Sequence, residues 1–570
     1  MSTRVVIDPV TRIEGHLRIE LLTEGQKITE AYAETTQFKG IELVMKDRDP
    51  RDAWAFVQRI CGVCTVVHAI ASVRAVEDAV VYPIPKQADL IRNLVLGSQI
   101  VQDHVIHFYH LQALDFVNVV NAAKADPSKA AVAASALEPR YPMNSGARFT
   151  AVKEQVAKVL ASGQLGIFSN GYWSHPDYRL TPELDLMAVS HYLDALTWQR
   201  SMIRINTLFG GKNPHPNFLV GGMASPINLD NQITINQVKL DKIQGMIKEA
   251  ITFVEDVFLP DVVTILGAYA DYATIGRSSP NFLALGKAGY NGAGYPKNSG
   301  LKPAALLDGN LANVVDFDSG QIEEYVTSGW YSYQGGNDKG LVPWNGETTP
   351  KYTGPKPPYT WLADDPRYTF SKAPRYAGRA VQVGPMPRVL MAYVQKDAET
   401  LELLTPILRK LGLKPEQLNS TAGRILGRAV EAVLLARQLQ TWFDEFTKGI
   451  RAGDVTTFNP DRWDPSSWPA SSKGVGFAEV ARGTLSHWVR IEGGKVANYQ
   501  AVVPSTWNGG GRALKQRGPY EEALSNGHPL VDAAAPLEAL RTIHSFDPCQ
   551  SCGIHVLDAS GHQLSWAKVQ

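Results

Sequence analysis

Four cysteines in two CxxC pairs most constrain how this 570-residue chain can fold. The first pair is Cys61 and Cys64, the second is Cys549 and Cys552, and a histidine follows each pair within a few residues. The sequence contains no other cysteine. Thiolates are strong ligands for soft transition metals, and the two pairs together supply four of them. The sequence therefore predicts one metal site that joins the beginning of the chain to its end.

Three kinds of site can use this pattern. A structural zinc site takes four thiolates, although its cysteines are usually close in sequence and form a small module. Disulfides fit poorly, because the sequence shows no secretion signal. A catalytic transition-metal site suits thiolates as well and leaves a position open for a small substrate. The spacing alone leaves structural zinc and a catalytic metal as open alternatives.

Five segments of the sequence point to one family. They are RICGVCTVVHA at 59–69, FDPCQSCGIH at 546–555, DPVTRIEGHLRIE at 8–20, ARGTLSHW at 481–488 and VVPSTW at 502–507. Together these segments resemble the motifs of the large subunit of nickel–iron hydrogenases. The matches run from residue 8 to residue 555, so the resemblance covers almost the whole chain.

The resemblance implies a nickel–iron centre held by all four cysteines. Cys61 and Cys549 would bind nickel alone, whereas Cys64 and Cys552 would bridge nickel and iron. The iron would also carry carbon monoxide and cyanide ligands. A centre of this kind splits H2 heterolytically, and it needs an open metal position, a base for the proton and an exit for electrons.

Glu14 matches the glutamate that relays protons away from the metal centre in this family. The ordinary alternative is a salt bridge from Glu14 to Arg12 or Arg18, because most carboxylates are solvated or paired. The position of Glu14 inside the RIEGH motif favours the proton relay.

By the same resemblance, Arg482 lies above the open metal position, where it positions a base or binds a cyanide ligand. Asp115 and Asp547 would share these surroundings. The family commonly has Pro-Arg-Gly, whereas Ala481 precedes the arginine here, which removes a fixed φ angle. The ordinary alternative for Asp547 is a turn or cap before Pro548.

Further residues are expected around the iron. Val503, Pro504 and Ser505 match the stretch that surrounds the diatomic ligands, and Ser505 would donate to a cyanide nitrogen. The ordinary alternative for Ser505 is a strand-end hydroxyl bonded to the backbone. His68 matches a histidine near the sulfur atoms and is expected to donate a hydrogen bond.

A second metal ion is also implied. Glu42, His555 and the backbone carbonyl of Ala501 match a site that binds magnesium in the family. Oxygen ligands suit that ion, whereas a histidine ligand is unusual for it. Val63 and Leu114 match residues that narrow the gas channel, although ordinary core packing would look the same in sequence.

Several histidines of the chain are not expected to bind metal. His104, His107 and His110 recur every three residues on a predicted helix, and His215 lies in an NPHPN segment. The helical histidines are interpreted as polar core, partner-contact or proton-network residues, and His215 as a residue near a partner.

The predicted fold class is α+β, mainly α, with a bundle of long helices, small peripheral sheets and a metal site between the chain's two ends. Residues 1–50 are predicted to form strands and turns. Residues 273–385 are rich in Gly, Pro and Tyr and are predicted to be an irregular region with short strands. Long helices are predicted by apolar spacing at 86–124, 181–210, 236–272, 388–412 and 421–450.

Because the paired ends must meet at one metal, we expect residues 1–555 to form a single interwoven domain. The last fifteen residues, 556–570, resemble the precursor extension of the family, which a maturation endopeptidase removes after His555. Read on its own, this extension would be a small hairpin with its turn at Ser560 and Gly561.

Charge and hydropathy restrict the partners. The 56 basic and 56 acidic residues balance, which argues against nucleic acid as a partner. The sequence shows no apolar run that could span a bilayer, and its start lacks the apolar core of a secretory signal. Export would therefore require a partner that carries the signal.

The resemblance implies an uptake hydrogenase of the membrane-bound respiratory type. Its four cysteines are all used at the metal centre, so the electrons would leave through an iron–sulfur small subunit in an obligate heterodimer. The heterodimer would lie on the periplasmic side of the cell membrane. A membrane cytochrome b or quinone-linked anchor would accept the electrons. The alternatives are a zinc-stapled structural protein and a scaffold related to the quinone-binding subunit of complex I, although that homologue lacks both CxxC pairs.

Overall fold

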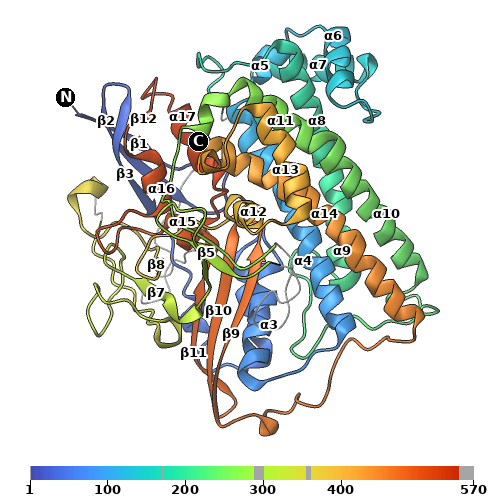
Figure 1. Ribbon diagram of the computed structural model, residues 1–570, viewed down its shortest axis with the longest axis vertical. Helices are drawn as coiled ribbons and strands as arrows, with labels where there is room; N and C mark the ends of the chain where they lie inside the picture. The colour runs from blue at the N-terminus through green and yellow to red at the C-terminus, as the bar shows by residue number, and fades with distance from the viewer. Residues whose placement is uncertain (1, 170, 288–300, 355–360, 551–570) are drawn as a thin grey trace.

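The computed structural model describes residues 2–169, 171–287, 301–354 and 361–550 of the chain (Figure 1). Long helices form the right-hand half of the view, and small antiparallel sheets lie to the left and below. This helix-rich fold with small sheets agrees with the predicted, mainly α class. The longest helices are α4 (Lys86–Ile106), α7 (Gly146–Ala161), α8 (Pro182–Met202), α10 (Gln237–Phe253), α13 (Ala398–Leu411) and α14 (Thr421–Arg451).

Shorter elements complete the described part of the chain. The shorter helices are α1 (Ile41–Val44), α2 (Ala53–Val57), α3 (Val67–Val80), α5 (Val119–Ala122), α6 (Pro127–Leu137), α9 (Arg204–Gly210), α11 (Leu259–Ala268), α12 (Pro385–Val394), α15 (Pro504–Gly509), α16 (Pro519–Leu524) and α17 (Leu537–Ser545). The strands are β1 (Ser2–Ile7), β2 (Leu17–Glu24), β3 (Lys27–Thr35), β4 (Phe282–Ala284), β5 (Ala304–Leu306), β6 (Val314–Asp316), β7 (Ile322–Tyr325), β8 (Ala373–Tyr376), β9 (Ser471–Val480), β10 (Gly483–Glu492), β11 (Lys495–Val502) and β12 (His528–Pro529).

Helix α14 confirms the prediction for residues 421–450 and packs along α4. Its start is fixed by Ser420, whose side chain accepts a hydrogen bond from the N–H of Gly423 at 3.0 Å. The two helices approach closely at Gly97, where an added Cβ would lie 2.9 Å from Leu439. The apolar face of α14 therefore forms part of the main core, as its spacing predicted.

The prediction of one helix over 86–124 is wrong at its end. Helix α4 stops at Ile106 and continues as a π-helical segment, His107–Gln112, and a 3₁₀ turn, Ala113–Asp115. Tertiary contacts favour the wider turn, because the His107 ring bonds the His544 carbonyl oxygen at 2.7 Å, and the side chain of Gln112 donates to the carbonyl of Arg541.

Two other predicted helices are also divided. The segment 236–272 contains a π-helical stretch, Val254–Phe258, before α11, because Pro260 lacks the N–H that would continue the regular ladder. The segment 388–412 breaks between α12 and α13, where the side chain of Asp397 caps the N–H of Thr400 at 3.0 Å. The segment 181–210 forms α8 followed directly by α9.

A buried three-stranded sheet, in the order β11-β10-β9, was not predicted. Its second hairpin turns at Gly493 and Gly494, both with positive φ angles, between the ends of β10 and β11. Two glycines between alternating strands are a strong hairpin signal, so the sequence did contain this information.

Helix α3 lies on this sheet (Figure 1), and it begins directly after the loop that contains the first cysteine pair. Two glycines of β9 permit the close approach. A Cβ on Gly476 would lie 2.0 Å from the Ala71 carbonyl oxygen, and one on Gly474 would lie 2.3 Å from that of Ala75. Substitution at either glycine would therefore displace α3 from the sheet.

The N-terminal strands pair with a strand from the other end of the chain. The four-stranded sheet has the order β1-β2-β3-β12, so residues 2–35 share a sheet with residues 528–529. The strands predicted in residues 1–50 are confirmed. The described parts of 273–385 contain short strands and 3₁₀ turns, as the composition predicted.

Candidate metal centre

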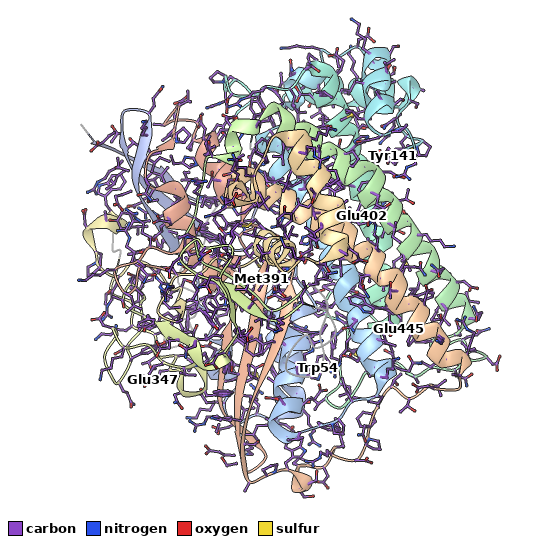
Figure 2. The ribbon with its side chains drawn as sticks, viewed as in Figure 1. Trp54, Tyr141, Glu347, Met391, Glu402 and Glu445 are labelled. Atoms are coloured by element: carbon purple, nitrogen blue, oxygen red, sulfur yellow. The ribbon has the colours of Figure 1, made fainter. Side chains whose placement is uncertain are left out.

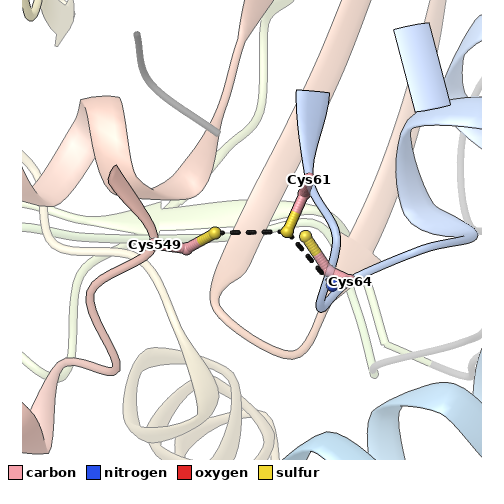
Figure 3. A group of neighbouring side chains, drawn as sticks. All are labelled: Cys61, Cys64 and Cys549. Carbon is pink, nitrogen blue, oxygen red and sulfur yellow. Dashed lines mark hydrogen bonds between the residues drawn. The ribbon is translucent and has the colours of Figure 1, made fainter. Parts of the chain in front are cut away.

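The sulfur atoms of three cysteines meet in the protein interior (Figure 3). Cys61 and Cys64 flank the loop before α3, and Cys549 follows α17. The Cys61 and Cys549 sulfurs are 3.4 Å apart, much longer than a disulfide bond of about 2.05 Å. All three residues are buried. The predicted junction of the chain's beginning and end is therefore present, while Cys552 and His555 lie outside the described residues.

The surroundings of the sulfurs favour thiolates. The backbone N–H groups of Val63 and Cys64 donate to the Cys61 sulfur at 3.3 and 3.1 Å. The guanidinium of Arg482 adds positive charge nearby. Burial lowers the pKa of Arg482, but the charges of Asp547 and the cysteines raise it well above its ordinary value. Converging thiolates beside a permanent cation fit a soft metal.

Arg482 lies in the tight connection between β9 and β10 and is held by Asp547. Its Nη2 atom is 2.9 Å from Asp547 Oδ1, and its Nε–H donates to the Asp547 carbonyl oxygen at 3.1 Å. Burial raises the pKa of Asp547, but Arg482 and His107 lower it below its ordinary range. These two contacts orient the guanidinium, although Ala481 replaces the usual proline.

Asp115 does not share these surroundings, so that prediction is corrected. Its carboxylate pairs with Arg12 and with His544, which lies 2.6 Å away. Besides Asp547, the second carboxyl group beside Arg482 is instead that of Asp103 on α4, whose Oδ2 lies 3.9 Å from Arg482 Nη1. Asp103 was not predicted as a site residue. Its usable signal in the sequence is an acidic residue within the apolar spacing of a predicted helix, where a carboxylate is unusual unless it is paired, and the structure shows that it is buried.

Glu14 lies directly beside the cysteine loops. Its carbonyl oxygen accepts the N–H of Gln550 at 2.7 Å, and it forms a parallel bridge with Cys549. A Cβ on Gly62 would lie 3.9 Å from the Glu14 carboxylate. The alternative partners are engaged elsewhere, because Arg12 pairs with Asp115 and Arg18 with Glu20.

A small cavity adjoins Cys64 and Arg482. Its walls are mostly apolar, and the polar groups among them are the Arg482 guanidinium, the Cys64 thiol, one hydroxyl and one imidazole. Ser505 accepts the N–H of Cys549 at 3.0 Å, so this hydroxyl touches the cysteine segment directly. Val503 is the buried residue before α15. The cavity is lined by Cys64, Val67, His68, Val480, Ala481, Arg482, Leu485, Pro504 and Ser505.

His68 bonds another histidine. Its Nδ1 lies 3.0 Å from Nε2 of His487, which in turn contacts Tyr499 at 2.6 Å. Burial lowers the pKa of His68 to about 4. His68 is therefore a neutral imidazole between the cavity and the sheet.

The surroundings of Glu42 differ from a simple magnesium site. Glu42 accepts the N–H of Ala501 at 3.1 Å and pairs with Lys372 at 3.2 Å. The same ammonium group donates to Gln500 Oε1 at 2.6 Å and lies 3.5 Å from Glu324. Glu42, Glu324, Lys372 and Ala501 line one cavity, in which Lys372 already supplies one positive charge.

The remaining predicted residues are placed as follows. Val63 is half-buried in the cysteine loop, and Leu114 is buried in the 3₁₀ turn after the π-helical segment. His215 bonds the Cys61 carbonyl oxygen at 2.9 Å. The histidines of 104–110 bond Glu431, the His544 carbonyl and the Tyr192 carbonyl, each away from the sulfurs.

No helix in the described part of the chain combines the length and hydropathy needed to cross a bilayer.

Comparison with known families gives a match over most of the chain. A family model described as nickel-dependent hydrogenase matches residues 39–555, and a HoxL-like model matches residues 4–38. This fold and its convergent cysteines belong to that class of metalloenzyme: the chain is a member of the nickel-dependent hydrogenase family.

Individual relatives cover the full chain. The uptake hydrogenase large subunit of Bradyrhizobium diazoefficiens is 45% identical, with 100% of this chain and 97% of that protein covered. The hydrogenase-1 large chain of Escherichia coli K12 is 41% identical over the same shares. Among solved structures, the reduced Ni-Fe-Se hydrogenase of D. vulgaris Hildenborough has a TM-score of 0.75 and 32% identity, covering 97% of this chain and 100% of that one.

Proposed function

We propose that this chain is the catalytic subunit of an uptake hydrogenase that oxidises H2 to two protons and two electrons. As a member of the nickel-dependent hydrogenase family, it is an oxidoreductase acting on H2. The observation that carries the proposal is the meeting of Cys61, Cys64 and Cys549 beside Arg482. A structural zinc site would not need a buried cation or a cavity next to its ligands.

Cys61, Cys64, Cys549 and Cys552 would hold a nickel–iron centre whose iron carries carbon monoxide and cyanide. When bound, the centre supplies the polarising metals that split H2 and accept its electrons. The apolar cavity beside Cys64 would enclose the diatomic ligands, and Ser505 would donate to a cyanide nitrogen. Excluding water from this cavity strengthens each electrostatic contact inside it.

Glu14 and Arg482 would handle the proton and the charge. Arg482 stays positively charged because Asp547 and the cysteines raise its pKa, so it orients and stabilises negative charge there. Glu14 pairs with Cys549 through the backbone, and its carboxylate lies near Gly62 of the other cysteine loop, so it would accept a proton released at the Cys549 sulfur. Its carboxylate would carry the proton toward solvent.

Electrons would leave through an iron–sulfur small subunit, since every cysteine of this chain would serve the metal centre. The names of the uptake hydrogenase relatives, which are called large subunits, support a small-subunit partner. This heterodimer would be exported and would lie on the periplasmic side of the membrane. A cytochrome b or quinone-linked anchor would receive the electrons.

Maturation would end the chain at His555. Residues 1–555 would form the single mature domain, and an endopeptidase would remove 556–570 after metal insertion. A magnesium ion would then bind Glu42, the Ala501 carbonyl and His555. Because Lys372 now pairs with Glu42, that ammonium group would have to give up its contact with the carboxylate.

Infrared spectroscopy of the heterodimer purified from its own host tests the proposal. Bands in the region of metal-bound carbon monoxide and cyanide, shifting under H2, are the expected result. Cys549→Ser should abolish both the bands and the nickel. A mature wild-type protein ending at His555 that holds zinc and shows no such bands would overturn the proposal in favour of a structural site.

A further inference from the structure

A second buried group of potential ligands lies between three helical elements, apart from the cysteines in sequence. Glu138 caps the end of α6, His191 lies in the middle of α8, and Asp261 lies in the first turn of α11. One ligand atom from each residue lies within 4.8 Å of the others. Their exposed fractions are 2%, 0% and 0%. The three side chains therefore form a dry, preformed cluster.

Neighbouring side chains fix the orientation of the imidazole. Asn144 donates through Nδ2 to Glu138 at 2.9 Å, so its Oδ1 faces Nε2 of His191 at 2.9 Å and must accept that N–H. On the other side of the ring, Nδ1 lies 2.9 Å from Asp261 Oδ2, and Nε2 also lies 3.5 Å from Glu138 Oε2, so both carboxyl groups face the imidazole. An amide that fixes the tautomer of a histidine in this way is typical of the surroundings of a metal ligand.

The carboxylates carry further lone pairs without a donor. Asp261 Oδ2 accepts the Tyr109 hydroxyl at 2.6 Å, whereas Asp261 Oδ1 and Glu138 Oε1 are buried and receive no hydrogen bond from a neighbouring donor. The two carboxyl groups instead face each other, and burial together with the Asp261 charge raises the pKa of Glu138 to about 10. Among the described residues, no lysine or arginine forms an ion pair with either carboxylate. Buried lone pairs facing one another are costly unless positive charge lies between them.

We propose that Glu138, His191 and Asp261 bind one divalent first-row metal ion of the zinc class. One imidazole nitrogen and two carboxylate oxygens suit such an ion, whereas magnesium and calcium prefer oxygen ligands alone. The ion would neutralise the two carboxylates and join the end of α6 to α8 and α11. Binding at this site would not require the hydrogenase reaction.

An access route lies next to the cluster. The ring of Tyr141 packs edge-on against His191, with 5.5 Å between the ring centroids, and it also lines a groove of about 500 Å³ between α8 and α10. Figure 2 labels Tyr141 at this edge of the helical half. Movement of one tyrosine would therefore open the cluster to an ion from solvent.

Zinc binding to the purified heterodimer tests the proposal. After dialysis against a chelator, incubation with Zn²⁺ and desalting, the wild-type enzyme should retain about one zinc per large subunit. X-ray absorption at the zinc edge should give nitrogen and oxygen neighbours at about 2.0–2.1 Å. Asp261→Asn and Glu138→Gln, which keep the side-chain shapes, should lose this zinc.

A variant of the supporting amide and a matched control sharpen the test. Asn144→Ala should weaken zinc binding by about 10–100-fold, because it releases the imidazole. Glu249→Gln should retain zinc, since Glu249 lines the same groove but bonds Ser201 outside the cluster.

Two wild-type results would overturn the proposal even if the variants failed to fold. Zinc with sulfur neighbours at about 2.3 Å would mean that the ion occupies the cysteine site. No retained zinc would mean that protons alone balance the cluster. In both cases the infrared bands would still report on the nickel–iron centre independently.

Discussion

Two buried clusters of charged side chains in this protein balance their charge differently. The first begins at Arg482 beside the cysteines and alternates in sign through the interior. The second contains two carboxylates and an imidazole on α6, α8 and α11, with no lysine or arginine paired to either carboxylate among the described residues. The alternating network consists of Arg482, Asp547, Arg428, His104, Glu431, Arg388 and Glu479.

Close contacts link the members of the alternating network. Arg428 lies 3.2 Å from Asp547 and 3.0 Å from the His104 ring, whose other nitrogen lies 2.8 Å from Glu431. Arg388 then bonds Glu431 through two nitrogens at 2.6 Å each. Three arginines face three carboxylates, and burial raises the pKa of a fourth carboxyl group, Asp103 beside Arg482, to about 8. At neutral pH the chain of buried charge therefore reaches the candidate metal centre without an excess of either sign.

The difference between the two clusters shows where a cation from outside the chain is needed. Arginine supplies a permanent charge and a planar fork, so the alternating network is complete with the chain's own side chains. The cluster of Glu138, His191 and Asp261 lacks such a residue, and its lone pairs call for an ion.

Arg482→Lys should have the largest effect, because a lysine keeps the charge but loses the fork that contacts Asp547 twice. H2 oxidation should fall by about 10²–10³-fold, the usual cost of removing one electrostatic donor, while nickel and iron contents stay unchanged. Arg490→Lys is the matched control, since Arg490 lies near the far end of β10, which follows Arg482, and its ion pair in the described part of the chain is with Glu492 at the surface. Activity of the Arg482 variant equal to that of the control would remove Arg482 from the mechanism.

Glu431→Gln should break the alternating network in its middle. Burial raises the pKa of Glu431, but Arg388 and His104 lower it to about 2. The Glu431 side chain is therefore negatively charged at neutral pH and compensates the charge of Arg388. Removing that charge leaves Arg388 undercompensated and should cost about 3–5 kcal/mol of unfolding free energy. Glu255→Gln breaks a surface pair with Arg437 and should cost less than about 1 kcal/mol in the same denaturation experiment. Equal losses would contradict the proposed importance of the network.

Asp185 on α8 is another buried carboxyl group whose hydrogen-bond donors are neutral, and its expected effect on stability is smaller. Its partners are the neutral N–H groups of Asn118 and Asn121, and burial raises its pKa from 3.8 to about 7. The folded state therefore holds a proton that the unfolded state releases, and stability should fall as pH rises from about 4 to about 7. The slope from this group is at most ~1.4 kcal/mol per pH unit. Asp185→Asn should lack this part of the slope, and an unchanged pH profile would refute the assignment.

Parts of the fold and site followed from the sequence because they depend on local pattern. The apolar spacing of 421–450 and the alternation in the first strands predicted elements that the structure contains. The CxxC pairs predicted a junction of the chain's ends, and the sulfurs of Cys61 and Cys549 do meet. Spacing within a motif is a short-range property, so tertiary contacts did not alter it.

Other parts could not be predicted because they depend on which side chains meet across the fold. The resemblance favoured Asp115 beside Arg482, but the π-helical turn after Ile106 and the pairing with Arg12 carry that carboxylate elsewhere. Asp103, one helical segment earlier, lies there instead.

The sequence by itself determined the ligand chemistry, the main helices and the family of this protein, since each is written in motifs or in periodicity. Only the tertiary structure decided which carboxylates face which cations. Glu138, His191 and Asp261 are separated by more than fifty residues at each step and share no motif, yet helix packing brings them together in a dry interior. Burial then turns an ordinary set of polar residues into a site, because lone pairs that water would satisfy must find a proton or a metal ion.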